Sequence, residues 1–195
     1  MSMDELTDGQ TPLDPDEAEG LIPSYVRTRQ ELNEWEQANI ASAIAWLSQR
    51  RRRNPVLSLS FLRELHRRMF GKTWRWAGKF RTSGKTIGIP ADQITEAVYN
   101  LLEDTKEQVK NRGSSADEIA VRFHHGLVRI HPFPNGNGRH AREMTDQLLR
   151  QLGQPPFSWG SADSGVTGKA RSAYLLALRA ADQGDLELLR TFVRS

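Results

Sequence analysis

The sequence contains no cysteine among its 195 residues and no long hydrophobic run. The absence of thiols excludes disulfide bonds, thiolate zinc sites and cysteine nucleophiles. No apolar stretch approaches the ~20 residues of a transmembrane helix, and the first residues, MSMDELTDGQ, lack the apolar core of a signal peptide. We therefore expect a soluble, cytoplasmic protein that does not bind membranes.

Basic residues are missing from the first 20 positions, which carry seven acids. The other 175 residues hold 27 basic and 17 acidic residues, a net charge of +10. A basic body of this kind suits an anionic ligand such as a nucleotide or a nucleic acid. Because the start of the chain is also rich in proline and glycine, we expect an extended acidic lead-in over residues 1–27 and one domain over residues 28–195.

Apolar residues recur at helical spacing over most of the chain after the lead-in. Two capping boxes mark helix starts, Thr28 with Glu31 and Ser115 with Glu118. In the first helix the recurring apolar residues are Leu32, Trp35, Ile40, Ala43, Ile44 and Leu47. The pattern predicts an all-α fold with seven or so helices, over residues 28–53, 60–70, 90–110, 115–130, 139–152, 166–183 and 186–193.

The helical pattern is interrupted between residues 74 and 90. This stretch is rich in aromatic and β-branched residues, and it is broken by Ser83-Gly84 and by Gly88. Such a composition is typical of two short strands joined by a turn. The sequence therefore predicts a small β-hairpin beside the helices.

The loop between the two strongest helical patterns carries the residues best suited to chemistry. Residues 135–138, Asn-Gly-Asn-Gly, contain two glycines that let successive N–H groups turn inward, and this anion nest opens into a helix N-terminus. Arg139 and Arg142 lie on one side of the first helical turn, where they oppose the helix dipole unless an anion is bound. His131, at the start of the loop, is a candidate proton acceptor at neutral pH.

Residues 131–142, HPFPNGNGRHAR, resemble the signature of the Fic/Doc family, H-x-F-x-[D/E]-G-N-G-R-x-x-R. Two further stretches agree with that family, HRRMFGKTWRWAGKFRT at 66–82 and FHHGLVRIHPF at 123–133. The stretches TPLDPDEAEGLIP and RTRQELNEWEQANIA nearer the start resemble most closely the subgroup called mobile mystery protein B. The resemblance covers residues 11–193, roughly the whole chain.

The resemblance implies a helical Fic fold that transfers AMP from ATP to a Tyr, Thr or Ser hydroxyl of a target protein. His131 would deprotonate that hydroxyl, and a buried Phe133 would anchor the loop. The phosphates would be bound by Gly136, Asn137, Gly138, Arg139 and Arg142. A flap within residues 74–90 would hold the target segment by strand addition, through Lys85, Thr86, Ile87, Gly88 and Ile89.

One position departs from the family pattern. The family has Asp or Glu where this chain has Asn135, at the site of the Mg²⁺ ion that bridges the phosphates. An amide oxygen can ligate a hard cation but brings no charge. We therefore expect weaker metal binding and slower transfer, or dependence on Mn²⁺.

Two other functions stay open. A non-catalytic protein that binds nucleotide or nucleic acid is supported by Asn135, by the net charge and by the basic run Arg50–Arg53, although such a run also suits a helix C-terminus. Doc-type relatives bind ATP in the reverse sense and transfer its γ-phosphate. Their loops lack the second glycine, so Gly138 favours AMP transfer, and we expect no nucleic-acid partner.

The resemblance also implies an inhibitory helix with the motif [S/T]-x-x-x-E-[G/N], whose glutamate pairs with the second motif arginine, here Arg142. Aligning residues 33–42, NEWEQANIAS, places Glu36 in the inhibitory position, although Leu32 and Gln37 depart from the motif. An exposed acid on a helix is the alternative interpretation of Glu36. A second candidate is Glu19, in the less helical lead-in.

Overall fold

The structure is a computed structural model, and it describes residues 18–26, 28–49, 55–161 and 167–195. These residues form seven α-helices and one 3₁₀ turn: α2 (Arg29–Gln49), α3 (Leu59–Phe70), η1 (Ala91–Gln93), α4 (Ile94–Asn111), α5 (Ala116–Ile130), α6 (Asn137–Gln151), α7 (Thr167–Asp182) and α8 (Glu187–Arg194). No helix in these ranges is long and apolar enough to cross a membrane. Most of the predicted acidic lead-in and the basic run at 50–53 lie outside the described residues.

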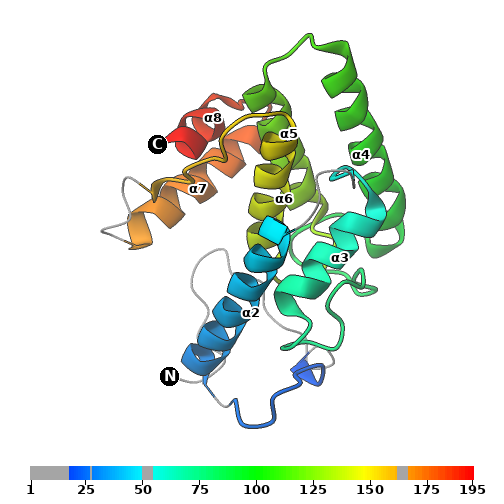
Figure 1. Cartoon of the computed structure of the whole chain (residues 1–195), viewed down its shortest axis with the longest axis vertical. Helices are drawn as coiled ribbons and strands as arrows, with labels where there is room; N and C mark the ends of the chain where they lie inside the picture. Colours follow the sequence, from blue (N-terminus) through cyan, green and yellow to red (C-terminus); the bar gives the residue numbers. More distant parts are fainter. Residues whose placement is uncertain (1–17, 27, 50–54, 162–166) are drawn as a thin grey trace.

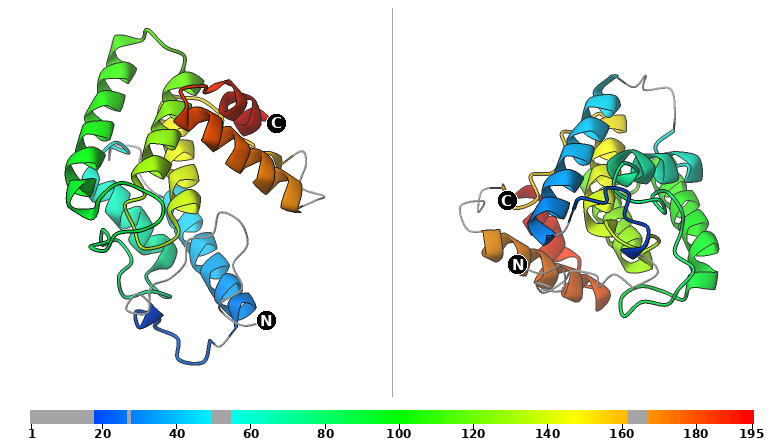
Figure 2. Two further views of the ribbon diagram at one scale, coloured as in Figure 1. Left: turned by 180° about the vertical axis from the view of Figure 1, so that it is seen from behind. Right: turned by 90° about the horizontal axis from the view of Figure 1, so that it is seen from below.

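Helices α5 and α6 run side by side through the middle of the molecule (Figure 1). Helix α4 packs on one side of this pair, and α7 with α8 lies on the other, as the reverse view also shows (Figure 2). Helices α2 and α3 pack on each other, and α3 also contacts α6. A larger apolar core lies between α2, α3, α4, α5 and α6. A smaller one lies between α5, α6, α7 and α8.

The bounds of α5 follow from its sequence. The Ser115 hydroxyl accepts the Glu118 N–H at 3.2 Å, and the Glu118 carboxylate accepts the Ser115 N–H at 2.9 Å, so the predicted capping box is formed. The predicted apolar stripe is buried in full, at Ile119, Phe123, Leu127 and Ile130. The helix ends where His131 turns into the left-handed region and Pro132 follows. Helix packing therefore fixes the place from which the motif loop starts.

Helix α2 buries a stripe that contains two polar side chains. Its inward face consists of Leu32, Glu36, Asn39, Ala43 and Leu47. Asn39 Nδ2 donates to Thr73 Oγ1 at 3.1 Å and to the carbonyl of Trp35 at 2.8 Å. Ile44, one of the apolar residues that recur in the sequence, is 47% exposed instead. The face of α2 is thus selected by polar partners as well as by apolar burial.

The predicted β-hairpin is wrong, because residues 74–90, all of them described, contain no strand. The N–H groups of Arg81 and Ile89 bond to the carbonyls of Pro132 and Ile130, in the chain around the start of the motif loop. The carbonyls of Ser83 and Ile89 are bonded by the Arg81 guanidinium. One side chain thus takes the place of a strand ladder, and we call residues 83–89 the flap segment.

Candidate active site

The loop between α5 and α6 is held by its own side chains. His131 has a φ of 53°, a left-handed conformation that costs a residue other than glycine about 1–2 kcal/mol. Asn137, the first residue of α6, closes the loop, since its Oδ1 accepts the Phe133 N–H at 2.9 Å and its Nδ2 donates to the Phe133 carbonyl at 2.8 Å. Phe133 is buried, as the sequence predicted. The side chain of Asn137 is thus committed to the loop, and only its backbone faces a ligand.

Gly136 allows the loop to enter α6. Its φ of 77° lies in the left-handed region, and a Cβ there would come within 2.5 Å of the Phe70 ring. Helix α6 then begins with no acidic residue in its first turn. Because the first N–H groups of a helix have no partner within it and carry its positive dipole end, this N-terminus suits a phosphate.

His66 supports the loop from α3. Its Nδ1 accepts the Gly78 N–H at 3.0 Å, which leaves Nε2 to donate to the Asn135 carbonyl at 3.1 Å. The imidazole also stacks on the Phe133 ring, with 3.6 Å between ring centres. Burial lowers the pKa of His66 well below its ordinary value, so the ring is neutral and keeps this tautomer.

Glu36 connects α2 to the motif arginine Arg139. Its Oε2 accepts from Arg139 Nη1 at 2.6 Å, and its Oε1 accepts from Trp74 Nε1 at 2.7 Å. The Glu36 side chain is 5% exposed, so this is a buried carboxylate with two charge-assisted partners. The implied pairing of Glu36 with Arg142 is wrong, because α2 brings the carboxylate to the first motif arginine instead.

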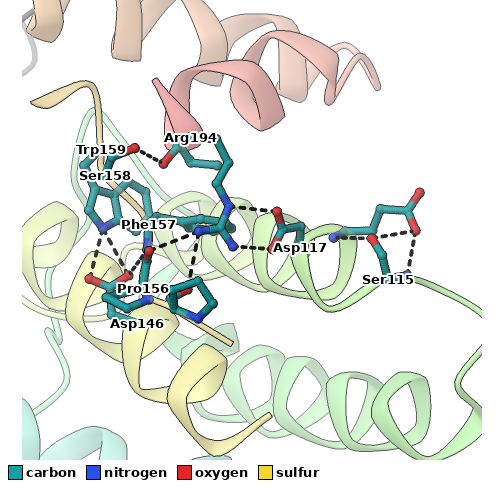
Figure 3. Close-up of polar contacts among 11 residues, drawn as sticks. Ser115, Asp117, Asp146, Pro156, Phe157, Ser158, Trp159 and Arg194 are labelled. Atoms are coloured by element: carbon teal, nitrogen blue, oxygen red, sulfur yellow. Dashed lines mark hydrogen bonds and ion pairs between the residues drawn. The ribbon is translucent and has the colours of Figure 1, made fainter. Parts of the chain in front are cut away.

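Arg142 is held by aromatic rings. Its guanidinium carbon lies 4.5 Å from the ring centre of Tyr174 and 5.4 Å from that of Trp159, within the range of cation–π attraction. Trp159 is itself fixed, since its Nε1 donates to both carboxylate oxygens of Asp146 at 3.0 and 3.2 Å (Figure 3). Arg194, which pairs with Asp117 on α5, ties the adjacent end of α8 to the same region (Figure 3).

A cavity of about 450 Å³ lies between α2, the motif loop, α6 and α7. Its volume is within the ~300–1,000 Å³ that is usual for small-molecule sites. Its polar lining includes the motif loop, the start of α6, Arg139 and Arg142. Its apolar lining includes Trp159, Tyr174, Leu175, Leu178 and Phe192, and Arg142 lies over the rings of Trp159 and Tyr174. The cavity therefore offers a ligand both cationic and apolar contacts.

His131 reaches this cavity in its neutral form. Burial, together with the charges of Arg81 and Lys85, lowers its pKa to about 4. A histidine with that pKa carries no charge at pH 7 and can accept a proton. Lys85 belongs to the flap segment and Arg81 lies two residues before it. This part of the chain therefore contributes, after burial, to the lowered pKa of His131.

The residues present fit a Mg²⁺ ion poorly. The Asn135 Oδ1 accepts the N–H of Gly136 at 2.6 Å, so the amide oxygen is turned back onto the loop. Among the described residues that line the cavity, Glu36 is the one carboxylate, and it is bound to Arg139. No group of three or more acidic or histidine side chains suited to a metal occurs in the described part of the chain. Hard divalent cations favour charged oxygen ligands, whereas the one carboxylate of this lining is bound to Arg139 and the family's metal position holds a neutral amide whose oxygen is engaged.

The cavity brings together most of the predicted site residues: Glu36, Ile87, His131, Asn135, Gly136, Asn137, Gly138, Arg139 and Arg142. It is not lined by the other predicted flap residues, Lys85, Thr86, Gly88 and Ile89, although Gly88 approaches the His131 side chain. Glu19, the second inhibitory candidate, is exposed, and its carbonyl is bonded by Arg75. The chemical roles of these residues stay predictions.

Sequence analysis missed four side chains that support the site, His66, Trp74, Arg81 and Tyr174. Each is buried: His66, Trp74 and Arg81 form hydrogen bonds to residues that line the cavity, and the ring of Tyr174 lies against Arg142. Three of them lie in the stretch 66–82, which the family resemblance singled out without assigning roles. Local periodicity could not find them, because the site residues that they contact are 32 or more positions away.

Comparison with known proteins agrees with this geometry. Residues 56–149 match the model of the Fic/DOC family. The chain is 32% identical over 142 residues to protein adenylyltransferase fic-1 of Caenorhabditis briggsae, and the aligned region covers 71% of this chain and 26% of that protein. It is 33% identical over 106 residues to protein adenylyltransferase VbhT of Bartonella schoenbuchensis, covering 49% of this chain and 21% of that protein. The chain thus spans about a quarter of the length of the curated relatives it matches.

Solved structures share the arrangement of helices. Fic-1 from C. elegans superposes with a TM-score of 0.65 at 25% identity, covering 91% of this chain and 51% of that one. The BepC protein of Bartonella tribocorum, solved with bound AMPPNP, superposes with a TM-score of 0.68 at 18% identity, covering 93% and 97% of the two chains. The family match at residues 56–149 includes the motif loop and the helices on either side of it. The chain therefore contains a Fic domain and belongs to the Fic/DOC family.

Proposed function

We propose that this chain is a protein adenylyltransferase, which moves AMP from ATP to a Tyr, Thr or Ser hydroxyl of a target protein. One observation carries the proposal: a single cavity is lined by His131, the N-terminus of α6 and two arginines. Relatives named protein adenylyltransferase and the AMPPNP-bound structure of the same fold support it. ATP and the target protein are both part of the proposal.

The cavity suggests how ATP would lie. The triphosphate would lie against the start of α6, where the N–H groups of residues 136–138, Arg139 and Arg142 offer hydrogen bonds and positive charge. The adenine would lie against apolar lining residues such as Leu175 and Leu178. The α-phosphate would then lie nearest to His131, because the loop that carries the histidine leads into the anion nest.

The reacting groups of the transfer step are the target hydroxyl, the α-phosphate of ATP and the imidazole of His131. The neutral His131 accepts the proton of the target hydroxyl, whose oxygen forms a bond to the α-phosphorus. The bond from that phosphorus to the oxygen shared with the β-phosphate breaks, and pyrophosphate leaves with both electrons. The α6 N-terminus and Arg139 neutralise the charge that develops on the phosphates, and positioning supplies much of the rate enhancement.

The flap segment would position the target. Ile87 lines the cavity and is 42% exposed, and the segment lies beside His131. An extended piece of the target lying along residues 85–89 would bring a hydroxyl to the histidine. Recognition through backbone groups would suit a range of target sequences.

Glu36 would keep the enzyme inactive until it is displaced. Its carboxylate occupies Arg139, one of the two guanidinium groups proposed for phosphate binding. A phosphate and Glu36 cannot use the same guanidinium edge, and two negative charges there would repel. ATP binding in a productive form would then require α2 to move or Glu36 to change rotamer.

The second candidate is a protein that binds nucleotide without transferring it. It is favoured by the neutral Asn135 at the family's metal position, whose amide oxygen is bonded to Gly136. In that case ATP would bind through the arginines and the nest, and no covalent product would form. The two candidates differ in the fate of the α-phosphate.

Labelled ATP separates these functions. The wild-type, Glu36→Gly and His131→Ala proteins are each incubated with ATP labelled at the α- or the γ-phosphate, with Mg²⁺ or Mn²⁺, alone and with cell lysate. We expect α-label on protein, most strongly with Glu36→Gly, and none with His131→Ala. Label from the γ-phosphate alone would mean a Doc-like kinase. ATP binding without label in any variant would mean the non-catalytic function.

A further inference from the structure

Arg81 carries a buried guanidinium whose hydrogen bonds go to backbone carbonyls on both sides of the active-site histidine. The residue is 3% exposed. Its Nε donates to the His131 carbonyl at 2.7 Å, and its Nη1 donates to the Ser83 carbonyl at 2.9 Å. Its Nη2 donates to the Ile89 carbonyl at 2.5 Å and lies 3.5 Å from the Ile130 carbonyl. One planar group thus joins both ends of the flap segment to the end of α5.

The backbone of Arg81 adds to this junction. Its N–H donates to the Pro132 carbonyl at 3.0 Å, so the residue bonds to two consecutive carbonyls, those of His131 and Pro132. The His131 carbonyl belongs to one of the two peptides that flank the left-handed His131, and the Ile130 carbonyl, 3.5 Å from Arg81 Nη2, belongs to the other. A strained conformation of this kind persists only where the surroundings specify it, and Arg81 supplies part of that specification.

Gly88 shows how closely the flap segment approaches the histidine. Its φ is +106°, and a Cβ there would lie 2.7 Å from the His131 Cβ, 2.8 Å from Arg81 Nη2 and 3.1 Å from the Ile130 carbonyl. No side chain fits between the segment and His131. Gly84, in the same segment, has nothing within 4 Å of an added Cβ. The contact is therefore local to Gly88, and it is the one that Arg81 holds together.

We propose that Arg81 is a positioning residue, whose guanidinium fork holds the flap segment and His131 in one fixed relationship. The proposal rests on the proposed function in one respect, since a target hydroxyl presented by the segment must reach the histidine. The Arg81 side chain makes the hydrogen bonds that a neighbouring strand would otherwise make. A lysine could not replace it, because an ammonium lacks the planar fork that reaches three carbonyls in different directions.

The charge of Arg81 supports the same role. Arg81 and Lys85, with burial, lower the pKa of His131, and the guanidinium is thus also a cation facing the proposed base. A cation placed there by three carbonyls keeps its distance to the imidazole constant. Positioning and electrostatics are therefore carried by the same group.

The test compares Arg81→Gln and Arg81→Lys with Arg63→Gln, a matched control. Arg63 also donates to a backbone carbonyl, that of Gly78 at 2.9 Å, but among the described residues it forms no hydrogen bond to the flap segment or to His131. Amide hydrogen exchange of residues 83–89 is measured by mass spectrometry, with thermal unfolding to check the fold. We expect exchange about 10-fold faster or more in both Arg81 variants and wild-type exchange in the control, because local opening of the segment becomes easier.

The second readout is kinetic and is made in a Glu36→Gly background. Self-labelling from α-labelled ATP is followed as a function of ATP concentration. We expect the maximal rate to fall about 100-fold in Arg81→Gln, with the KM for ATP changed less than about threefold, because the nest is untouched while the acceptor is misplaced. Full rescue by Arg81→Lys in either readout would overturn the fork role.

Unchanged exchange and unchanged labelling in Arg81→Gln would overturn the proposal as a whole. Should the Arg81 variants fail to fold, Gly88→Ala tests the same contact without removing a buried charge, with Gly84→Ala as its control. Faster exchange around residues 83–89 in Gly88→Ala alone supports the proposal, and equal behaviour of the two alanine variants refutes it. Wild-type and Glu36→Gly proteins that transfer no α-label, either to themselves or to any protein of a cell lysate, would refute the proposed function, while the exchange result still decides the role of Arg81.

Discussion

The carboxylate of Glu36 bridges Trp74 Nε1 and Arg139 Nη1, at 2.7 and 2.6 Å. Glu36 thus links α2 both to Trp74, in the chain that follows α3, and to the first turn of α6. The indole bond fixes the rotamer of Glu36, and the fixed rotamer aims the second oxygen at the arginine. The bridge closes one wall of the cavity and occupies one of its two motif arginines.

Replacing Glu36 by glycine should open the site to ATP. We expect ATP affinity to rise about 10-fold, because Arg139 loses a competitor for the phosphate and a buried charge pair to an arginine is strong. Isothermal titration with a non-hydrolysable ATP analogue measures the change. Glu34→Gly, at an exposed position of the same helix, is the control for helix destabilisation by glycine. Equal affinity in Glu36→Gly and Glu34→Gly would mean that Glu36 does not compete with ATP.

His131→Ala should abolish transfer and leave ATP binding intact. The imidazole is proposed as the proton acceptor, a role worth ~100- to 10,000-fold in rate, whereas the phosphates bind to the nest and the arginines. The same assay across pH should show a flat rate from about pH 6 to 8 and a fall towards pH 4, since the pKa of His131 is lowered to about 4. An acidic limb near the ordinary histidine pKa of about 6.5 would contradict the buried, neutral base.

The buried histidines should make the fold sensitive to mild acid. Burial lowers the pKa of His124 to about 3 and the pKa values of His131 and His140 to about 4. Between the unfolded value of about 6.5 and these pKa values the unfolded chain binds more protons, so stability falls as the pH drops through that window. Asp146 acts in the opposite sense, because burial raises its pKa to about 6.

His66, whose pKa burial also lowers, makes four histidines against one aspartate, so the free energy of unfolding should be lower at pH 5 than at pH 7.5. Urea titrations at the two pH values measure this difference. A midpoint that rises on going to pH 5 would show that Asp146 dominates and that the histidines are not held neutral.

Asn135→Asp should make ATP binding more dependent on Mg²⁺. In the wild-type protein we expect ATP affinity to differ less than about threefold between Mg²⁺ and a chelator, because the amide oxygen is neutral and is bonded to Gly136. A carboxylate there supplies the charge that the donor set lacks. Asn33→Asp, on the α2 wall of the same cavity, adds the same charge elsewhere. A strict Mg²⁺ requirement in the wild-type protein would contradict the poor fit.

Much of the fold could be predicted from local sequence. The apolar stripes of α3 and α5 recur at helical spacing, and the start of α5 is marked by the Ser115 capping box, so both helices were expected close to their observed bounds. The spacing of apolar residues along one face of a helix is a local property of the chain, so it can be recognised in the sequence. The stripe of α2 was misjudged, since its inward face includes Glu36 and Asn39 and leaves Ile44 exposed.

The hairpin was mispredicted for a related reason. Aromatic and β-branched residues between 74 and 90 favour extended chain, but strands need partners, and the partner here is the Arg81 side chain with the end of α5. Strand propensity measures how well side chains fit a paired surface, so it cannot tell which group will do the pairing.

Local sequence is enough to predict the helices, the anion nest that leads into α6 and the presence of a histidine and two arginines around it, because these depend on neighbours within a few residues. Tertiary structure alone decided that Glu36 meets Arg139, that Arg142 lies against Tyr174, that His66 supports Asn135 and that Arg81 holds His131. Those pairs join residues 32 to 103 positions apart. Which of several possible partners a charged side chain reaches depends on how the helices pack, and packing is a property of the whole folded chain.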